Sequence, residues 1–377
     1  MITDKKHIKK LIRFLLEFRA PLRFLPWLIS IVLAIVKQFS EDDVAQNAVI
    51  SEQRVFLHSK EPYVCGCSAC AVDGTGVAAA ACAALEDGAV VNKLVIFRAS
   101  SVAGLRSSRR AEIYSTPLQI SSVKLGVVSG KVFVIWHEET GGEISLTPGL
   151  PDEYKQIVRA KTRSARCGKP GGTFCAVVDD ENRLGEIFGY DALFTSAPVD
   201  IGGGEALVPG IAAGHAVIFK KRAVADSFEL LSRLPSPKGS GYVGSVSICR
   251  QNDGRLLAAL SCERSIYLSC SDDMGVTWSV PSFVCAGGDD PFISSDSTGN
   301  ITLVYCCPEK AMPVRARVRL FDASEFSEEK TTVVNVGKVL DVSTAKTEDG
   351  FVTFSVAEQF HGENGCVMAT IWKFYDI

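Results

Sequence analysis

Residues 271–278 read Ser-Asp-Asp-Met-Gly-Val-Thr-Trp. The short polar side chains of Ser271 and Asp273 can bond to backbone N–H groups and so close a turn. Gly275 provides the positive φ that a tight reversal needs, and Thr277 and Trp278 suit the start of a strand. We therefore predict a hairpin in which a strand over 265–270 turns through this string and returns at 278–280. The five residues are predicted to be structural.

The string fits the pattern S-x-D-x-G-x-T-W. It resembles the Asp-box (BNR repeat), the hairpin motif of the sialidase-like superfamily and of other Asp-box β-propellers. The resemblance implies a propeller built from four-stranded blades. In that family the Asp-boxes lie away from the substrate pocket. Because turn closure and Trp packing account for every fixed position, the motif predicts a fold and not an activity.

Short apolar runs bounded by turns dominate the chain after residue 55, which indicates an all-β protein. The chain has 377 residues and a formal net charge of −3, which gives no indication of nucleic-acid binding. Turns recur at intervals of roughly 35–55 residues, near the period of a propeller blade. The clear turns are Asp73-Gly74, Asp253-Gly254 and Asp349-Gly350; looser ones are Ser129-Gly130 and 298–300, and the least regular are Asp179-Asp180 and Gly214-His215.

These turns predict a β-propeller of about six four-stranded blades over residues 55–377. The alternative is a pair of stacked β-sandwich domains, with the Pro- and Gly-rich stretch 235–241 as the linker. Residues 40–54 are predicted to be a polar linker in front of the propeller.

Residues 1–39 form a segment of different character, in which Lys and Arg alternate with apolar residues. The pattern predicts a basic amphipathic and hydrophobic helix, interrupted at Pro21. Its uninterrupted apolar run, 24–36, is shorter than the ~20 residues that span a bilayer. The segment is either a signal anchor, a peripheral membrane helix or a helix that docks on a protein partner.

The sequence contains 13 cysteines, an odd number that leaves at least one unpaired. Most lie in apolar strand-like runs, where they act as small hydrophobic residues. The cluster Cys65, Cys67 and Cys70 lacks a fourth metal ligand nearby, so neither a metal nor a cofactor is predicted. Reduced cysteines favour synthesis and assembly in a cytosol. The protein is expected to be associated with a membrane or built into a larger assembly such as a virion.

A sialidase would need further residues, which the resemblance only partly supplies. The family holds the sugar carboxylate with three arginines and attacks with a tyrosine activated by a glutamate. The family's first arginine lies in a Phe/Tyr-Arg-Ile-Pro string, but this chain has Phe97-Arg98-Ala99-Ser100, so that role is not carried to Arg98. The catalytic candidates are Glu263, Arg264 and Tyr305, and Arg315, Arg317 and Arg319 alternate along one strand as a solvated or partner-facing row.

The leading hypothesis is therefore a non-catalytic sialidase-like propeller that acts as a structural or interaction module. It would be a viral or phage particle component, bound to a protein partner or a membrane through residues 1–39. One alternative is a membrane-anchored exo-sialidase or another glycoside hydrolase. Another is a lectin-like propeller with a glycan ligand, for which Trp136 and Trp372 are candidate rim aromatics.

Overall fold

The fold is described from a computed structural model of the chain. The chain divides after Gln46, and every described residue belongs to the unit Asn47–Ile377. The predicted helix over 1–39 lies outside the described residues. Those residues are 48–57, 63–87, 89–101, 104–105, 109–139, 171–222, 228–237, 242–295, 301–307, 314–321, 330–335, 338–347, 350–358 and 366–374.

The prediction of an all-β chain is confirmed, because the described residues form six antiparallel sheets. Sheet A contains β23 (Lys338–Thr347), β24 (Gly350–Glu358), β25 (Cys366–Phe374) and β1 (Ala48–Leu57). Sheet B contains β2 (Tyr63–Val72), β3 (Thr75–Glu86), β4 (Ala89–Ala99) and β5 (Arg109–Thr116). Sheet C contains β6 (Gln119–Val128), β7 (Lys131–Glu139), β8 (Gly172–Val178) and β9 (Phe188–Tyr190).

The remaining three sheets follow in chain order. Sheet D contains β10 (Leu193–Phe194), β11 (Val199–Gly202), β12 (Glu205–Ala212), β13 (His215–Lys221) and β14 (Phe228–Arg233). Sheet E contains β15 (Val243–Arg250), β16 (Leu256–Cys262), β17 (Ser265–Ser271) and β18 (Ser282–Ala286). Sheet F contains β19 (Asp289–Ser295), β20 (Ile301–Cys307), β21 (Val314–Phe321) and β22 (Lys330–Asn335).

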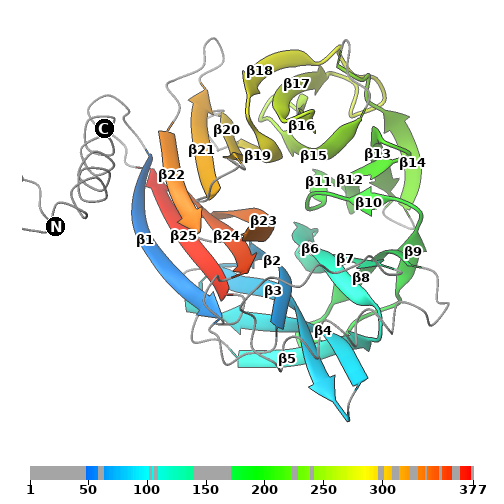
Figure 1. The fold of residues 1–377 in the computed structure, drawn as a ribbon. Helices are drawn as coiled ribbons and strands as arrows, with labels where there is room; N and C mark the ends of the chain where they lie inside the picture. The colour runs from blue at the N-terminus through cyan, green and yellow to red at the C-terminus, as the bar shows by residue number, and fades with distance from the viewer. Residues whose placement is uncertain are drawn as a thin grey trace, which may run out of the picture. The chain divides into compact units, whose positions relative to one another are not determined.

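Within this unit the first strand of each sheet lies nearest a common axis, and the sheets follow one another around it (Figure 1). Strand β2 contacts β6 and β23, β11 contacts β6 and β15, and β19 contacts β15 and β23. Each sheet is thus covered on both faces by its neighbours. This arrangement explains why the strands read as continuous apolar runs and not as alternating ones.

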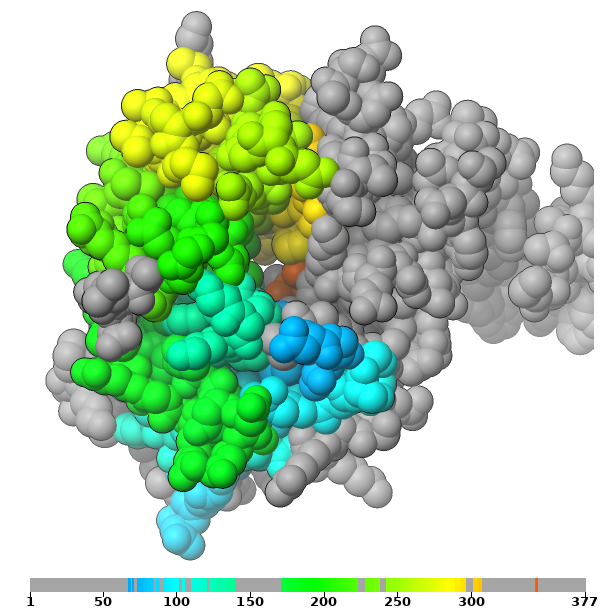
Figure 2. Space-filling model, turned by 180° about the vertical axis from the view of Figure 1, so that it is seen from behind, coloured from blue at the N-terminus to red at the C-terminus, as the bar shows by residue number. Residues whose placement is uncertain are grey.

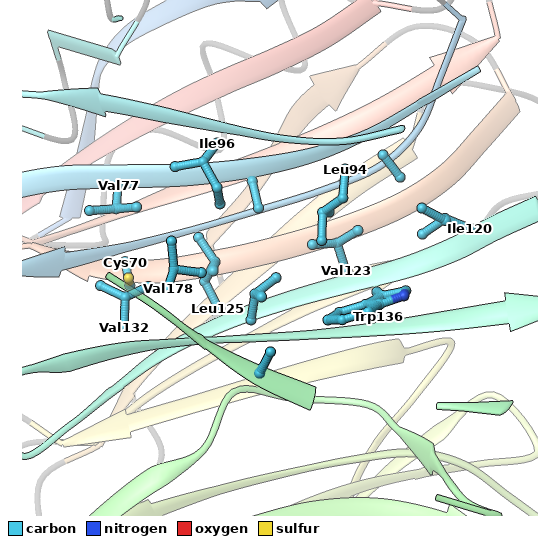
Figure 3. Close-up of a cluster of buried hydrophobic side chains, with 14 of the residues drawn as sticks. Cys70, Val77, Leu94, Ile96, Ile120, Val123, Leu125, Val132, Trp136 and Val178 are labelled. Carbon is cyan, nitrogen blue, oxygen red and sulfur yellow. The ribbon is translucent and has the colours of Figure 1, made fainter. Parts of the chain in front are cut away.

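The core consists of apolar layers between successive sheets, as Figure 3 shows for sheets B and C. Val77 and Leu94 of sheet B pack with Leu125 and Trp136 of sheet C, and all four side chains are buried. Strand β3 carries the small buried run Ala78-Ala79-Ala80-Ala81, which allows the neighbouring sheets to approach closely. Figure 3 also shows Cys70 within this layer, where burial raises the pKa of its thiol to about 12.

Strand β1 corrects the predicted boundary between linker and domain. The predicted linker, 40–54, overlaps β1 over residues 48–54. Strand β1 pairs antiparallel with β25, from Ala48↔Phe374 to Leu57↔Val367, and so completes sheet A from the other end of the chain. Local sequence cannot reveal this pairing, because the polar residues of β1 resemble a linker until their distant partner is known.

The predicted turns match the hairpins unevenly. Asp73-Gly74, Ser129-Gly130 and Asp253-Gly254 each join the first strand of a sheet to its second. The two least regular turns do not join the first strand of a sheet to its second. Gly214-His215 belongs to the hairpin between β12 and β13, and Asp179-Asp180 follows β8. The first strand of sheet D is instead split into β10 and β11, both of which pair with β12.

Pro198, between β10 and β11, explains the split, because proline cannot donate a backbone hydrogen bond to a sheet. Pro198 is buried and packs on Gly126 of β6, where an added Cβ would lie 2.5 Å from the Pro198 Cδ. A search of the described residues finds no helix that is long and apolar enough to cross a membrane.

Candidate functional site

The Ser271–Trp278 string forms a closed turn after β17. Asp273 Oδ1 accepts hydrogen bonds from Ser271 Oγ at 2.8 Å and from Thr277 N at 2.9 Å, and its Oδ2 accepts from Thr277 Oγ1 at 2.6 Å. These bonds, that of the Thr277 hydroxyl first, lower the pKa of Asp273 to about 2. Gly275 has φ +87° and donates its N–H to Ser271 Oγ. Every polar group of the motif therefore serves the turn itself.

The same turn packs on the preceding sheet. Trp278 is 8% exposed, and its Nε1 donates to Gly275 O at 3.0 Å and to Ser232 Oγ, just after Leu231 in β14, at 3.2 Å. The indole lies in the apolar layer between sheets D and E, together with Leu207 and Leu260. The motif thus joins two sheets through buried apolar area.

The returning strand was predicted too early. It was expected at 278–280, but β18 begins at Ser282. Ser279 explains the delay. In a regular ladder Cys270 N would donate to a backbone carbonyl of the returning strand, but here it donates to the Ser279 hydroxyl at 3.0 Å. The Ser279 N–H still donates to Cys270 O at 2.8 Å, so the chain is held to β17 before regular pairing begins.

The three catalytic candidates lie in two different environments. Glu263 and Arg264 form the two-residue turn between β16 and β17, with φ values of 48° and 59°, and both are exposed. Tyr305 in β20 is 0% exposed and packs in the layer between sheets E and F with Ile266. Arg264 O accepts from Gly288 N at 3.0 Å, and Gly288 also packs against the Tyr305 ring. The backbone of the turn therefore approaches Tyr305, while the charged side chains remain in solvent.

The other arginines considered above are placed away from the axis. Arg98 lies at the end of β4 and reaches sheet C, where its Nε donates to Asn182 Oδ1 at 2.6 Å and its Nη2 to Asp179 O at 2.8 Å. Arg315, Arg317 and Arg319 lie in β21, the third strand of sheet F, with β20 and β19 between it and the axis. Arg317 is the backbone partner of Tyr305.

Near the axis, residues from all six sheets line a narrow cavity with about 40 Å³ of free space, enough for a few water molecules. Its lining is Ser68, Lys124, Thr195, Ser196, Ala197, Ser245, Asp290, Pro291, Phe292, Ser343 and Thr344. In Figure 2 a small orange-red area from β23 lies at the centre, between teal β6 and the yellow-gold atoms of sheet F.

Hydroxyl groups connect the innermost strands around this cavity. Ser68 Oγ and Ser343 Oγ are hydrogen-bonded at 3.0 Å, and Leu125 N donates to Ser68 Oγ at 3.0 Å. On the other side Thr195 Oγ1 donates to Val246 O at 2.7 Å. The described lining contains one cation, Lys124, and no arginine. Its hydroxyl groups bond mainly to the protein itself.

A wider pocket, which was not predicted, opens at the seam between sheets C and D. It has a volume of about 530 Å³. Its lining is His137, Glu138, Glu139, Gly171, Gly172, Tyr190, Asp191, Ala192, Leu193, Ile211, Ala212 and Ala213. Among the described residues, this lining includes His137, two glutamates and Asp191 beside an apolar wall, and no lysine or arginine.

Glu138 is the most constrained of these carboxylates. It is 3% exposed, and its Oε1 accepts from Tyr114 Oη at 2.8 Å and from Trp136 Nε1 at 3.0 Å, while its Oε2 accepts from Thr116 Oγ1 at 3.1 Å. Burial, followed by the bond to Glu138, raises the pKa of Tyr114 to about 12. Trp136 is itself fully buried and stacks on Phe174, so its ring is part of the core and not of a rim.

His137 stands beside Glu138 on the pocket wall. Its Nδ1 lies 2.9 Å from Thr173 Oγ1. Desolvation lowers the pKa of His137, although Glu139 and Glu138 act in the opposite direction. The imidazole is therefore neutral near pH 7 and adds no positive charge to the pocket.

Strand β2 separates two cysteines of the cluster at 65–70, for which no metal was predicted. Cys67 and Cys70 are buried and form no disulfide, and their odd spacing along β2 places them on opposite faces. Among the described residues, no group of three or more His, Cys, Asp or Glu side chains could hold a metal ion.

Solved structures with a similar fold include sialidases and a protein of unknown function. The chain is similar to an unknown-function protein from Dyadobacter fermentans, with 13% identity and a TM-score of 0.64 over 87% of this chain and 99% of that one. It is also similar to Trypanosoma rangeli sialidase, with 10% identity and a TM-score of 0.58 over 88% of this chain and 60% of the sialidase. The fold is sialidase-like.

A third similar structure is NanB in complex with Optactamide, with 8% identity and a TM-score of 0.58 over 89% of this chain and 71% of NanB. No protein-family profile matches the sequence, and no curated protein matches it either. At these identities the likeness concerns the fold alone, and this chain spans about 60% of the length of the T. rangeli enzyme.

Proposed function

We propose that the six sheets are the blades of a β-propeller and that the protein is a non-catalytic interaction module built on a sialidase-like fold. The blades would be joined by the Asp-box hairpin of sheet E, by Arg98 between sheets B and C, and by β1, which completes sheet A. In this proposal the five Asp-box residues have a purely structural role.

The observation that carries the proposal is the narrow cavity near the axis. A sialidase site must hold a carboxylate with arginine side chains and must also admit a sugar ring. Here about 40 Å³ is free, hydroxyl groups fill the wall, and Lys124 is the one cation in the described lining. The buried Tyr305 and the solvent-exposed Arg264 further support a role in packing and turn formation.

The proposal extends to the N-terminal segment. Residues 1–39 would attach the propeller to a protein partner or a membrane, within a larger assembly such as a viral particle. The support for this part is the basic and apolar pattern of the sequence alone.

Hydrolysis of a fluorogenic α-sialoside by the full chain tests the proposal. We expect release no faster than the buffer blank, both for the wild type and for the Arg264→Ala variant. Turnover by the wild type that Arg264→Ala abolishes would replace the proposal with an exo-sialidase. A mass-spectrometric screen against other glycosides extends the test to the remaining glycoside hydrolases.

A further inference from the structure

The outer edge of sheet E differs in charge from the outer edges of the other sheets. Sheet E ends in β18, on the side of the sheet that faces away from the axis (Figure 1). Strand β18 reads Ser-Phe-Val-Cys-Ala and contains no charged residue. The outer strands β1, β5, β14 and β22 all contain charged residues, and the sixth, β9, is three residues long. Charges and shortness are the usual means of keeping an edge from pairing, and β18 has neither.

Exposed hydrophobic side chains are concentrated in the segment that leads into β18. Seven large hydrophobic side chains are exposed in the part of the chain that the structure describes, and four of them lie within residues 274–283. Met274 and Val276 flank Gly275, Val280 precedes β18 and Phe283 lies in it, with exposed fractions from 37% to 61%. Single exposed apolar side chains are ordinary, but a group of them indicates a contact surface.

Phe283 is held in place although it is exposed. Its ring packs edge-on against Tyr267 of β17, with 5.8 Å between the ring centroids and 76° between the ring planes. The two residues are also direct partners in the register of β17 and β18, and Tyr267 packs on the apolar layer between sheets D and E. The Phe283 ring is therefore preorganised, which reduces the entropy lost when a partner binds.

The charges around β18 suit a second copy of the same edge. At one end Asp272 Oδ1 accepts from Arg255 Nε at 2.7 Å, and at the other end Ala286 pairs with Ser265, just after the oppositely charged Glu263 and Arg264. A closed two-fold contact requires an edge that is complementary to itself. An uncharged strand meets this requirement, because it can face its own copy without repulsion between like charges. A strongly charged partner strand would find no charge in β18 to match its own.

We propose that β18 is the docking edge for a second copy of this chain. The two β18 strands pair antiparallel around a two-fold axis at Phe283, so that each Phe283 ring lies opposite its copy and the two sheets E become one sheet. An edge strand has backbone N–H and C=O groups without a strand partner on its outer side, and these groups supply the hydrogen bonds. Because the strand is short, the interface is small and the dimer is reversible. The inference rests on the proposed function, for which it names one partner.

Sedimentation velocity of the full chain over a series of concentrations tests the inference. We expect the wild type to change from monomer to dimer as its concentration rises. Phe283→Asp should raise the dissociation constant by about tenfold or more, because it places two like charges opposite each other across the pair. The matched control is Leu230→Asp in β14. Leu230 and Phe283 are both 61% exposed, and the Leu230 variant should associate as the wild type does.

A covalent cross-link keeps the test independent of association through any other part of the chain, residues 1–39 included. With diamide as the oxidant, Phe283→Cys should form a disulfide-linked dimer, because the two-fold axis brings the two copies of this position together. Leu230→Cys and the wild type, which has the native cysteines alone, should not. Ala286→Lys removes no side-chain bond and adds a charge to the edge, so it should weaken association even if Phe283→Asp folds poorly.

Three results would overturn the inference: a wild type that stays monomeric, equal dissociation constants for the wild type and both charged β18 variants, or equal cross-linking of Phe283→Cys and Leu230→Cys. Self-association is measured without a sialoside, so this inference and the proposed function can fail separately.

Discussion

The axial cavity and the C–D pocket differ in how fully their polar groups are used. At the axis, hydroxyl groups from neighbouring sheets bond to one another and leave about 40 Å³ free. At the C–D seam, three carboxylates border about 530 Å³ without a lysine or arginine in the described lining. The first region resembles a closed core, whereas the second is a wide recess at the surface.

This difference matters because sialidase-like folds invite the assumption that function lies at the axis. Fold does not determine function, and the site must be argued from its own chemistry. In this chain the axial cavity is nearly filled. Substitutions at the axis and beside the seam are therefore compared with matched substitutions elsewhere in the sheets.

Gly126→Ala should cause the largest loss of stability, about 3 kcal/mol. The added methyl group would lie 2.5 Å from Pro198 Cδ and 3.0 Å from Pro198 O, the first of which is shorter than real Cβ contacts. Gly172→Ala at the seam is the control, since its nearest new contact is an ordinary 3.4 Å to Tyr190 O. Urea unfolding of both variants gives the comparison. Equal losses would contradict tight packing at the axis.

Ser68→Ala should cost about 2 kcal/mol, because the buried Leu125 N–H and the Ser343 hydroxyl both lose their partner. The matched control is Ser282→Ala in β18, an exposed serine whose hydroxyl donates to Leu268 O. We expect that variant to stay within about 0.5 kcal/mol of the wild type. The free energy of unfolding is the measurement. An unchanged value in Ser68→Ala would mean that water replaces the Ser68 hydroxyl as the partner of Leu125 N and Ser343 Oγ.

Tyr114→Phe should cost about 1 kcal/mol, through the loss of one of the three hydrogen bonds that hold Glu138. Tyr267→Phe is the control, because the Tyr267 ring packs on Phe283 at the edge of sheet E. Urea unfolding of both variants gives the comparison, and equal losses would contradict a stabilising bond between Tyr114 and Glu138.

His137 should give the smallest effect, visible as a dependence on pH. Desolvation lowers the pKa of His137 in the folded state below its ordinary value of 6.5. The unfolded chain therefore binds the proton first as pH falls, and stability is lost below about pH 6.5. His137→Gln should reduce this loss relative to the wild type between pH 7 and 5. Identical pH profiles of thermal unfolding would show that His137 titrates normally.

The sequence was most informative where one segment contains its own bonding partners. Ser271, Asp273 and Gly275 bond to one another or to Thr277, so the turn could be predicted from eight residues. For the same reason, the Asp-Gly and Ser-Gly turns correctly predicted the hairpin between the first and second strands of three sheets. All-β architecture followed from these local signals.

It was least informative where partners come from distant segments. Nothing near β1 indicates that it completes sheet A, and nothing near Arg98 indicates that it holds the loop at Asp179 and Asn182. The bonds of Glu138 were missed because two of its partners, Tyr114 and Thr116, lie in sheet B. A glutamate two residues after Trp136, at the end of an apolar run, was the one available signal.

Titration of the full chain with sialic acid, followed by saturation-transfer NMR, tests most directly whether this sialidase-like fold lacks a sugar site. Binding is the better measurement because an inactive lectin would also escape a hydrolysis assay. We predict no saturable signal, for the wild type and for Arg264→Ala alike. Saturable binding that Arg264→Ala removes would contradict the account and place a sugar site at the β16–β17 turn.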